Sequence, residues 1–162
     1  PRASLPPMRT LSPAILKPVI DRWTQAAPGA RSVGSCVVLA ILDHPDQVTG
    51  LTVDRAVGIA SRWGIGAGEV VVKPHPRDPR SMTVITEGHG VGAIEAKWPV
   101  ETTFSSLRSG AIVLGGNSSG MLLAAVLRPD LDLRLRAKED SALWRLLTSI
   151  DARARLEPIS DG

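Results

Sequence analysis

The chain has 162 residues, of which 43% are hydrophobic, enough for one globular domain with a single buried core. Its net charge is +3, but the arginines are scattered and aromatic residues are scarce, so nucleic-acid binding is disfavoured and small anionic ligands fit the charge equally well. The lone Cys36 excludes an internal disulfide and a cysteine-rich metal site. Without a secretion signal or a transmembrane segment, the protein is expected to be cytoplasmic, with peripheral membrane association left open.

The first 30 residues differ in composition from the rest of the chain. They hold six prolines around a short helical pattern at 14–23, which is typical of a linker or of the remnant of a preceding domain. The chain starts with Pro1 instead of Met, so we expect a fragment or a trimmed chain. The folded domain is expected over residues 31–162.

From residue 33 onward, short runs of branched aliphatic residues alternate with amphipathic patterns. Strands are predicted over 36–42, 69–73, 92–96, 111–115 and 131–135. Helices are predicted over 52–63, 100–108, 118–127 and 140–150, with a short helix or strand at 82–86 and a frayed tail after 150. This alternation implies right-handed βαβ crossovers, so the predicted fold class is α/β, a Rossmann-like parallel sheet with flanking helices.

The strand at 69–73 ends in a rigid cationic loop that contains Lys73, His75 and Pro76. Prolines on both sides of His75 fix the backbone and remove two amide donors. An imidazole held there can donate a hydrogen bond to a phosphate or protonate a leaving oxygen, and Lys73 can reach the same anion. The alternatives are a turn histidine with its ring in solvent and a solvated lysine.

A second candidate anion site follows the strand at 111–115, where Asn117, Ser118 and Ser119 precede a helical pattern. If a helix begins there, its free N–H groups, its dipole and the hydroxyls favour a phosphate, whereas the alternative is an ordinary N-cap. His44, after the first strand, lies in a turn or lines a base or ribose pocket. No dinucleotide fingerprint, P-loop or nucleophile elbow is present, and the three histidines form no ligand set, so we expect no catalytic metal.

Four short motifs occur in the order that is typical of one enzyme family. They are Leu-Asp-His-Pro, Val-Val-Val-Lys-Pro-His-Pro-Arg-Asp, Trp-Pro-Val-Glu and Val-Leu-Gly-Gly-Asn-Ser-Ser-Gly, and together they span about residues 33–150. This pattern resembles the C-terminal nucleotide-binding domain of bacterial sialyltransferases, including polysialyltransferases and lipooligosaccharide sialyltransferases. The resemblance implies one half of a GT-B arrangement of two Rossmann-like domains. It also implies a nucleotide sugar, CMP-sialic acid, as donor substrate, with no cofactor.

The resemblance assigns roles to individual residues. His75 and Pro76 match the family's His-Pro motif, whose histidine contacts the phosphate of CMP and helps the nucleotide leave. Ser118 and Ser119 match its paired-serine motif, which binds the same phosphate. Glu101 matches a Pro-x-Glu element at the head of a helix and is expected to bind the ribose hydroxyls.

In the family that this chain resembles, the general base lies in the N-terminal domain, and the four motifs of this chain match only the C-terminal domain. In sialyltransferases of this kind, paired Asp or Glu followed by Gly in the N-terminal domain activates the acceptor hydroxyl, whereas the only acid pair here, Glu139-Asp140, precedes Ser141. We therefore expect the donor half of a transferase, with little or no turnover alone and an acceptor domain as a missing or separate partner. Two alternatives stay open. One is a CDP-glycerol or CDP-ribitol phosphotransferase of teichoic acid synthesis, which shares the His-Pro and Ser-Ser elements; the other is a non-catalytic nucleotide-binding module.

Overall fold

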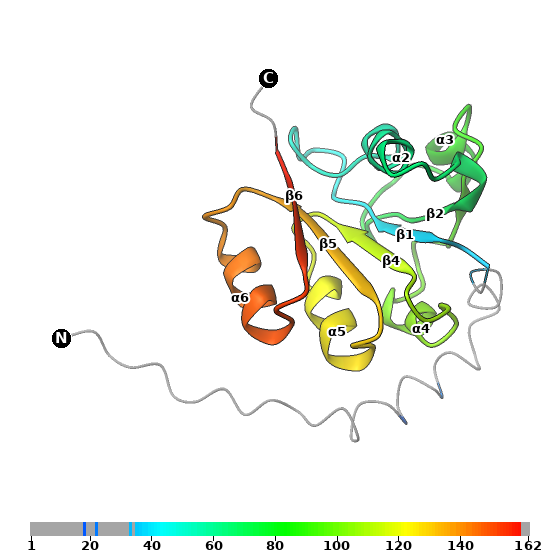
Figure 1. Cartoon of the computed structure of the whole chain (residues 1–162). Helices are drawn as coiled ribbons and strands as arrows, with labels where there is room; N and C mark the ends of the chain where they lie inside the picture. The colour runs from blue at the N-terminus through cyan, green and yellow to red at the C-terminus, as the bar shows by residue number, and fades with distance from the viewer. Residues whose placement is uncertain (1–17, 19–21, 23–32, 34, 160–162) are drawn as a thin grey trace.

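The centre of the molecule is a parallel β-sheet. The structure, a computed structural model, describes residues 18, 22, 33 and 35–159, so the predicted proline-rich segment and its helical pattern lie almost entirely outside the described residues. The described strands form one six-stranded sheet in the order β3-β2-β1-β4-β5-β6, with every neighbouring pair parallel (Figure 1). They are β1 (Val38–Ile41), β2 (Val70–Lys73), β3 (Gly92–Ala93), β4 (Ile112–Gly115), β5 (Asp132–Ala137) and β6 (Arg155–Pro158). The predicted α/β, Rossmann-like class is confirmed.

Helices cover both faces of this sheet. On one face lie α2 and α3, and on the other lie α4, α5 and α6 (Figure 1). Their bounds are α2 (Val53–Arg62), the 3-10 turn η2 (Ala67–Glu69), α3 (Met82–Thr86), α4 (Glu101–Phe104), α5 (Gly120–Leu127) and α6 (Ala142–Ile150). Among the residues that the structure describes, no helix is both long enough and apolar enough to span a bilayer.

The buried strands explain why the sequence shows apolar runs instead of alternation. In β1, Val38 and Ala40 belong to the core under α2, whereas Leu39 and Ile41 belong to the core under α4, α5 and α6. Successive side chains of a strand point to opposite faces, so a strand that is covered twice needs apolar residues at every position. All four residues of β1 are accordingly buried.

The prediction of a frayed tail after residue 150 was wrong, because Arg155–Pro158 forms the edge strand β6 on β5. Its Arg-Leu-Glu-Pro sequence has no apolar run, so nothing local indicates a strand. The partner strand supplies the reason: Arg134 stacks over the Trp63 ring at 3.9 Å and lies 3.8 Å from the Glu157 carboxylate. Charged residues and a proline are common on sheet edges, where they discourage pairing with other chains.

Two predicted elements are shorter in the structure. The strand expected at 92–96 pairs only over Gly92–Ala93, since the chain then turns away, with the Trp98 amide donating to the Glu95 carbonyl. The helix expected at 100–108 ends at Phe104, and the chain continues in single turns closed by hydrogen bonds from residue i to i−3. The segment at 82–86, predicted as a helix or a strand, is the helix α3.

Candidate functional site

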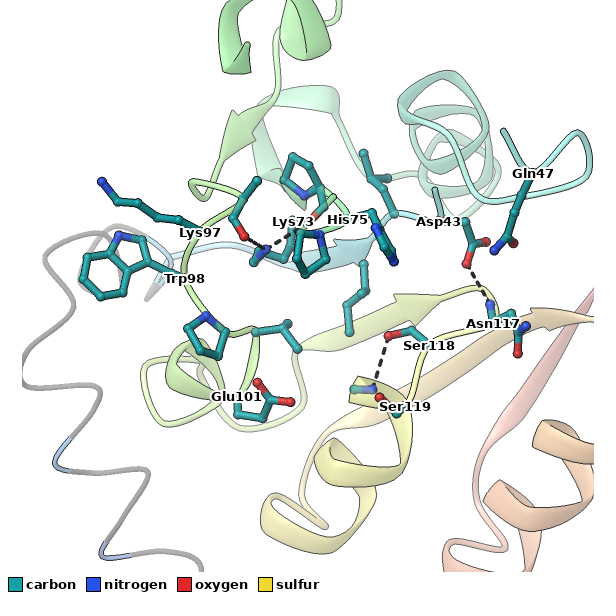
Figure 2. Close-up of a pocket in the computed structure, with 18 residues that line it drawn as sticks. Asp43, Gln47, Lys73, His75, Lys97, Trp98, Glu101, Asn117, Ser118 and Ser119 are labelled. Atoms are coloured by element: carbon teal, nitrogen blue, oxygen red, sulfur yellow. Dashed lines mark hydrogen bonds between the residues drawn. The ribbon is translucent and has the colours of Figure 1, made fainter. Parts of the chain in front are cut away.

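The candidate site lies where the order of the strands reverses. From β1 the chain adds β2 and β3 on one side and then returns to add β4, β5 and β6 on the other. In open α/β sheets, ligands bind outside the carboxyl ends of the strands at such a reversal. A cavity of about 420 Å³ lies there, formed by the loops after β1, β2 and β4 and by the segment before α4 (Figure 2). Seven of the predicted site residues line it: Lys73, His75, Pro76, Glu101, Asn117, Ser118 and Ser119.

His75 is half-buried on the wall of this cavity, directly after β2. Its ring atom Nδ1 accepts a hydrogen bond from the Arg77 amide at 3.2 Å, so in the neutral ring the proton is on Nε2. Burial, followed by the positive charges of His44 and Arg77, lowers the pKa of His75. At neutral pH, the ring is therefore an uncharged hydrogen-bond donor through Nε2.

His44 lies in a turn, one of the two places expected for it, and is not among the residues that line the cavity. The structure puts its ring edge-on against His75, with 5.1 Å between the ring centroids and 84° between the planes. Its Nδ1 accepts from the Asp46 amide at 3.3 Å, as in a turn. His44 thus belongs to the same end of the sheet, as expected, but acts on the site through its contact with His75.

Lys73 is the most unusual residue of the site, because it is only 2% exposed. Its Nζ donates to the carbonyls of Pro74 at 2.9 Å and Ala96 at 3.0 Å, which ties the end of β2 to the segment before α4 (Figure 2). Burial lowers the pKa of Lys73 to about 8, while the nearby Glu101 carboxylate acts in the opposite direction. An ammonium group has three donors, so one is left for a ligand in the cavity.

The paired serines stand at the start of α5, as predicted, but they do not act as a conventional N-cap. Ser119 is the residue before the helix, yet its hydroxyl accepts no capping hydrogen bond from the described N–H groups of α5. The Ser118 hydroxyl accepts from the Gly120 amide at 3.2 Å instead. The Ser119 hydroxyl is exposed at the positive end of the helix dipole, where it can meet an anion.

Asp43 is one of the site residues that sequence reasoning missed. It follows β1, is 7% exposed, and its carboxylate accepts from the Leu51 amide at 2.7 Å and the Asn117 amide at 2.9 Å. It therefore connects the loop after β1 to the loop after β4 (Figure 2). Gly116 makes room for it, since a Cβ there would lie 1.7 Å from Asp43 Oδ2. An acid at the end of one buried strand, opposite a Gly-Gly pair at the end of another, was the available signal.

The Asp43 carboxylate also decides where an anion can sit. The dinucleotide-binding proteins hold a phosphate with a glycine-rich loop after the first strand. Here the buried Asp43 carboxylate fills that position, which disfavours an anion there.

Glu101 and Trp98 form the opposite side of the cavity. Glu101 is the first residue of α4 and is half-buried, close enough to Lys73 for its charge to raise the lysine's pKa. Trp98 is half-buried beside it and packs on the core, with Lys97 Nζ 5.7 Å from its ring centroid. This aromatic wall was not predicted as part of the site, although aromatic faces commonly carry nucleic-acid bases.

The described residues include no group of three or more His, Cys, Asp or Glu side chains placed to hold a metal ion. The cationic and hydrogen-bonding groups that line the cavity include Lys73, His75 and Ser119, beside the start of α5, and also Lys97, Asn117 and Ser118. No protein-family model, curated protein or solved structure matches the chain.

Proposed function

We propose that this cavity binds a cytidine nucleotide sugar similar to CMP-sialic acid, as the donor-binding domain of an inverting, sialyltransferase-like glycosyltransferase. The observation that carries the proposal is the convergence of His75, Lys73 and Ser119 on one cavity at the switch point of the sheet, with Glu101 on its far side (Figure 2). The motifs that suggested the family are thus brought together around one cavity.

In this proposal the phosphate of the donor lies between the ends of β2 and β4. When the bond between the sugar's anomeric carbon and the phosphate oxygen breaks, the electron pair stays with CMP and negative charge grows on its phosphate. Three preorganised groups oppose that charge: the Nε2–H of His75, the ammonium of Lys73 and the Ser119 hydroxyl at the start of α5. An adjacent phosphate also favours protonation of His75, which prepares the ring to transfer a proton.

Glu101 is proposed to orient the nucleoside. A carboxylate accepts hydrogen bonds from two neighbouring hydroxyl groups, and the ribose of a nucleotide presents such a pair. The charge of Lys73 nearby keeps Glu101 from repelling the phosphate. Trp98 extends the same wall and offers an apolar surface to the base.

The acceptor half of the reaction is proposed to come from elsewhere. Transfer needs a base for the acceptor hydroxyl, and the carboxylates that line the cavity have other partners in this scheme: Asp43 accepts two backbone amides, and Glu101 is assigned to the ribose. An acceptor-binding domain, on a longer chain or on a partner, would supply that base. On its own, the chain is expected to bind the donor nucleotide with little or no turnover.

Calorimetric titration with CMP, cytidine and UMP tests the proposal directly. We expect CMP to bind more tightly than cytidine, because only CMP has the phosphate, and more tightly than UMP if the base is read. His75→Ala should weaken CMP binding by roughly tenfold, since a charge-assisted hydrogen bond contributes about 1.5–3 kcal/mol. Equal affinities for CMP and cytidine, or no binding by a demonstrably folded chain, would overturn the proposal.

A further inference from the structure

A second cavity of about 420 Å³ opens at the same edge of the sheet, beside the first. The two cavities share Asp43, Gln47 and Asn117, which form the ridge between them. The outer walls of the second cavity come from the end of β5, with Arg136, and from the first residues of α6. Nothing in the function proposed above uses this space.

Arg136 lies half-buried on the wall of this second cavity. Two of the other half-buried arginines pair with an aspartate two residues away, Arg128 with Asp130 and Arg134 with Asp132, and the third, Arg55, donates to the carbonyls of Val48 and Gly50. Arg136 is half-buried and, among the residues that the structure describes, it has no carboxylate partner within ion-pair distance. Its guanidinium instead donates from Nη1 to the Thr49 carbonyl.

This hydrogen bond fixes the guanidinium and leaves most of its donors unused. A guanidinium has five N–H donors in a rigid fork that matches carboxylate and phosphate oxygens. Burial and the neighbouring charge of Arg55 lower the pKa of Arg136, whereas Asp43 raises it. A cation that is held in place, desolvated and close to a like charge is one that a bound anion would stabilise.

The start of α6 faces the same cavity. The Ser141 hydroxyl accepts from the Trp144 amide at 3.1 Å, while Ala142 and Leu143, whose amides have no partner within a helix, line the cavity. Lys138 and Asp140 are exposed at its rim and carry opposite charges. Arg136 and the helix end therefore make one side of the cavity positive, whereas Asp43 on the ridge and Asp140 at the rim are negative, so an anion is favoured on the side of Arg136.

The geometry of a phosphodiester links the two cavities. With the phosphate at Ser118 and Ser119, Figure 2 shows Glu101 and Trp98 on one side and Asn117 and Gln47 on the other. The nucleoside takes the side of Glu101 in the function proposed above. The second substituent of the phosphate then leads toward Asn117, and past it into the second cavity.

We propose that the second cavity holds the part of the donor beyond its phosphate, and that Arg136 binds a second anionic group there, either a carboxylate or a further phosphate. This inference rests on the proposed function, because it takes the phosphate position from it. It assigns the recognition of the donor's second acidic group to Arg136, whether that group is a carboxylate of the transferred part or a phosphate of its linkage to the nucleotide.

Calorimetry with four ligands tests the inference: CMP, CMP methyl ester, CMP-sialic acid and CDP-glycerol. The methyl ester has the diester linkage without a second anion, CMP-sialic acid adds a carboxylate, and CDP-glycerol adds a phosphate. We expect either CMP-sialic acid or CDP-glycerol to bind to the natural chain more tightly than the methyl ester does. The tighter of the two shows whether Arg136 binds a carboxylate or a phosphate. Arg136→Gln should remove about tenfold or more of that affinity while changing CMP and the methyl ester less than twofold.

Two further variants keep the test decisive. Arg136→Lys retains the charge without the fork and should lose only part of the preference, which also covers the case in which Arg136→Gln folds poorly. Arg108→Gln, at an exposed position that lines neither cavity, is the matched control and should change nothing. An unchanged preference in Arg136→Gln, or an equal loss for all four ligands, overturns the inference alone. No binding of CMP by the folded natural chain overturns the proposed function, and the inference with it.

Discussion

A methyl group at residue 116 would compete with the Asp43 carboxylate for the same space. In Gly116→Ala the new Cβ would lie 1.7 Å from Asp43 Oδ2 and 2.5 Å from its Cγ, far inside van der Waals contact. Gly50 packs closely against Asp43 as well, since a Cβ added at Gly50 would lie 2.8 Å from Asp43 Cβ. The carboxylate must therefore leave its position between the two loops.

The cost of that displacement follows from the two hydrogen bonds that are lost. The Leu51 amide at 2.7 Å is buried, and the Asn117 amide at 2.9 Å is partly buried. Hydrogen bonds to a charged group contribute about 1.5–3 kcal/mol each, so Gly116→Ala should lower the free energy of unfolding by about 3–6 kcal/mol. This is a large fraction of the roughly 5–15 kcal/mol that a domain of ordinary stability has.

Urea unfolding of Gly116→Ala, Asp43→Ala and the double variant measures the effect. Asp43→Ala loses the same two hydrogen bonds, but it also empties the space that the new methyl group needs. The double variant should therefore be about as stable as Asp43→Ala alone, with a coupling energy of about 3 kcal/mol. Gly58→Ala is the control: it lies in α2 with nothing within 4 Å of a Cβ, and should stabilise the chain by up to about 1 kcal/mol. Additive losses in the double variant would refute the clash.

Three further predictions concern the binding site. Burial lowers the pKa of Lys73 to about 8, so CMP affinity, measured by calorimetry, should fall as the pH rises above 8 and the lysine loses its charge. The Lys73→Arg variant should bind CMP with the same affinity from pH 8 to 10. A constant affinity over this pH range in the natural chain would contradict the prediction. In His44→Ala, one of the charges that lower the pKa of His75 is gone, so an NMR titration should show that pKa rise; an unchanged value would exclude the coupling. Ser119→Ala should weaken CMP binding by about tenfold without changing cytidine binding or the melting temperature. Ser118→Ala should also lower the melting temperature, because the Ser118 hydroxyl accepts a hydrogen bond from the Gly120 amide at the start of α5. An equal loss of cytidine affinity in Ser119→Ala would show that Ser119 does not contact the phosphate.

The strands of the sheet could be predicted wherever the information was local. The runs that became β1, β2 and β4 are buried at each position and apolar except at the final Lys73 of β2, because both faces of the sheet are covered. The strand β6 could not be predicted, because its polar sequence has no local strand pattern. It pairs with β5, where Arg134 stacks on Trp63 and lies close to the Glu157 carboxylate of β6. Whether such a segment forms an edge strand is decided by its tertiary contacts and not by its intrinsic β-propensity.

The candidate site shows the same division. His75 and Ser119 were found because prolines, glycines and hydroxyls at strand ends are visible in a single sequence. Asp43 was missed because its role depends on an amide 74 positions away, which no spacing rule connects to it. The orientation of His44 toward His75 likewise depends on how two loops meet, and sequence placed it only at the right end of the sheet.

The strand order reverses between β1 and β4, so the sheet has two halves, β3-β2-β1 and β4-β5-β6, which pair through β1 and β4. Lys73 and His75 follow β2 on one side of β1, and Ser119 follows β4 on the other side, so a nucleotide bound between them would connect the two halves of the sheet. Ligand binding stabilises the folded form by about 2.7 kcal/mol at a hundred times the dissociation constant. A bound nucleotide is therefore expected to raise the melting temperature of the domain, and its removal to lower it.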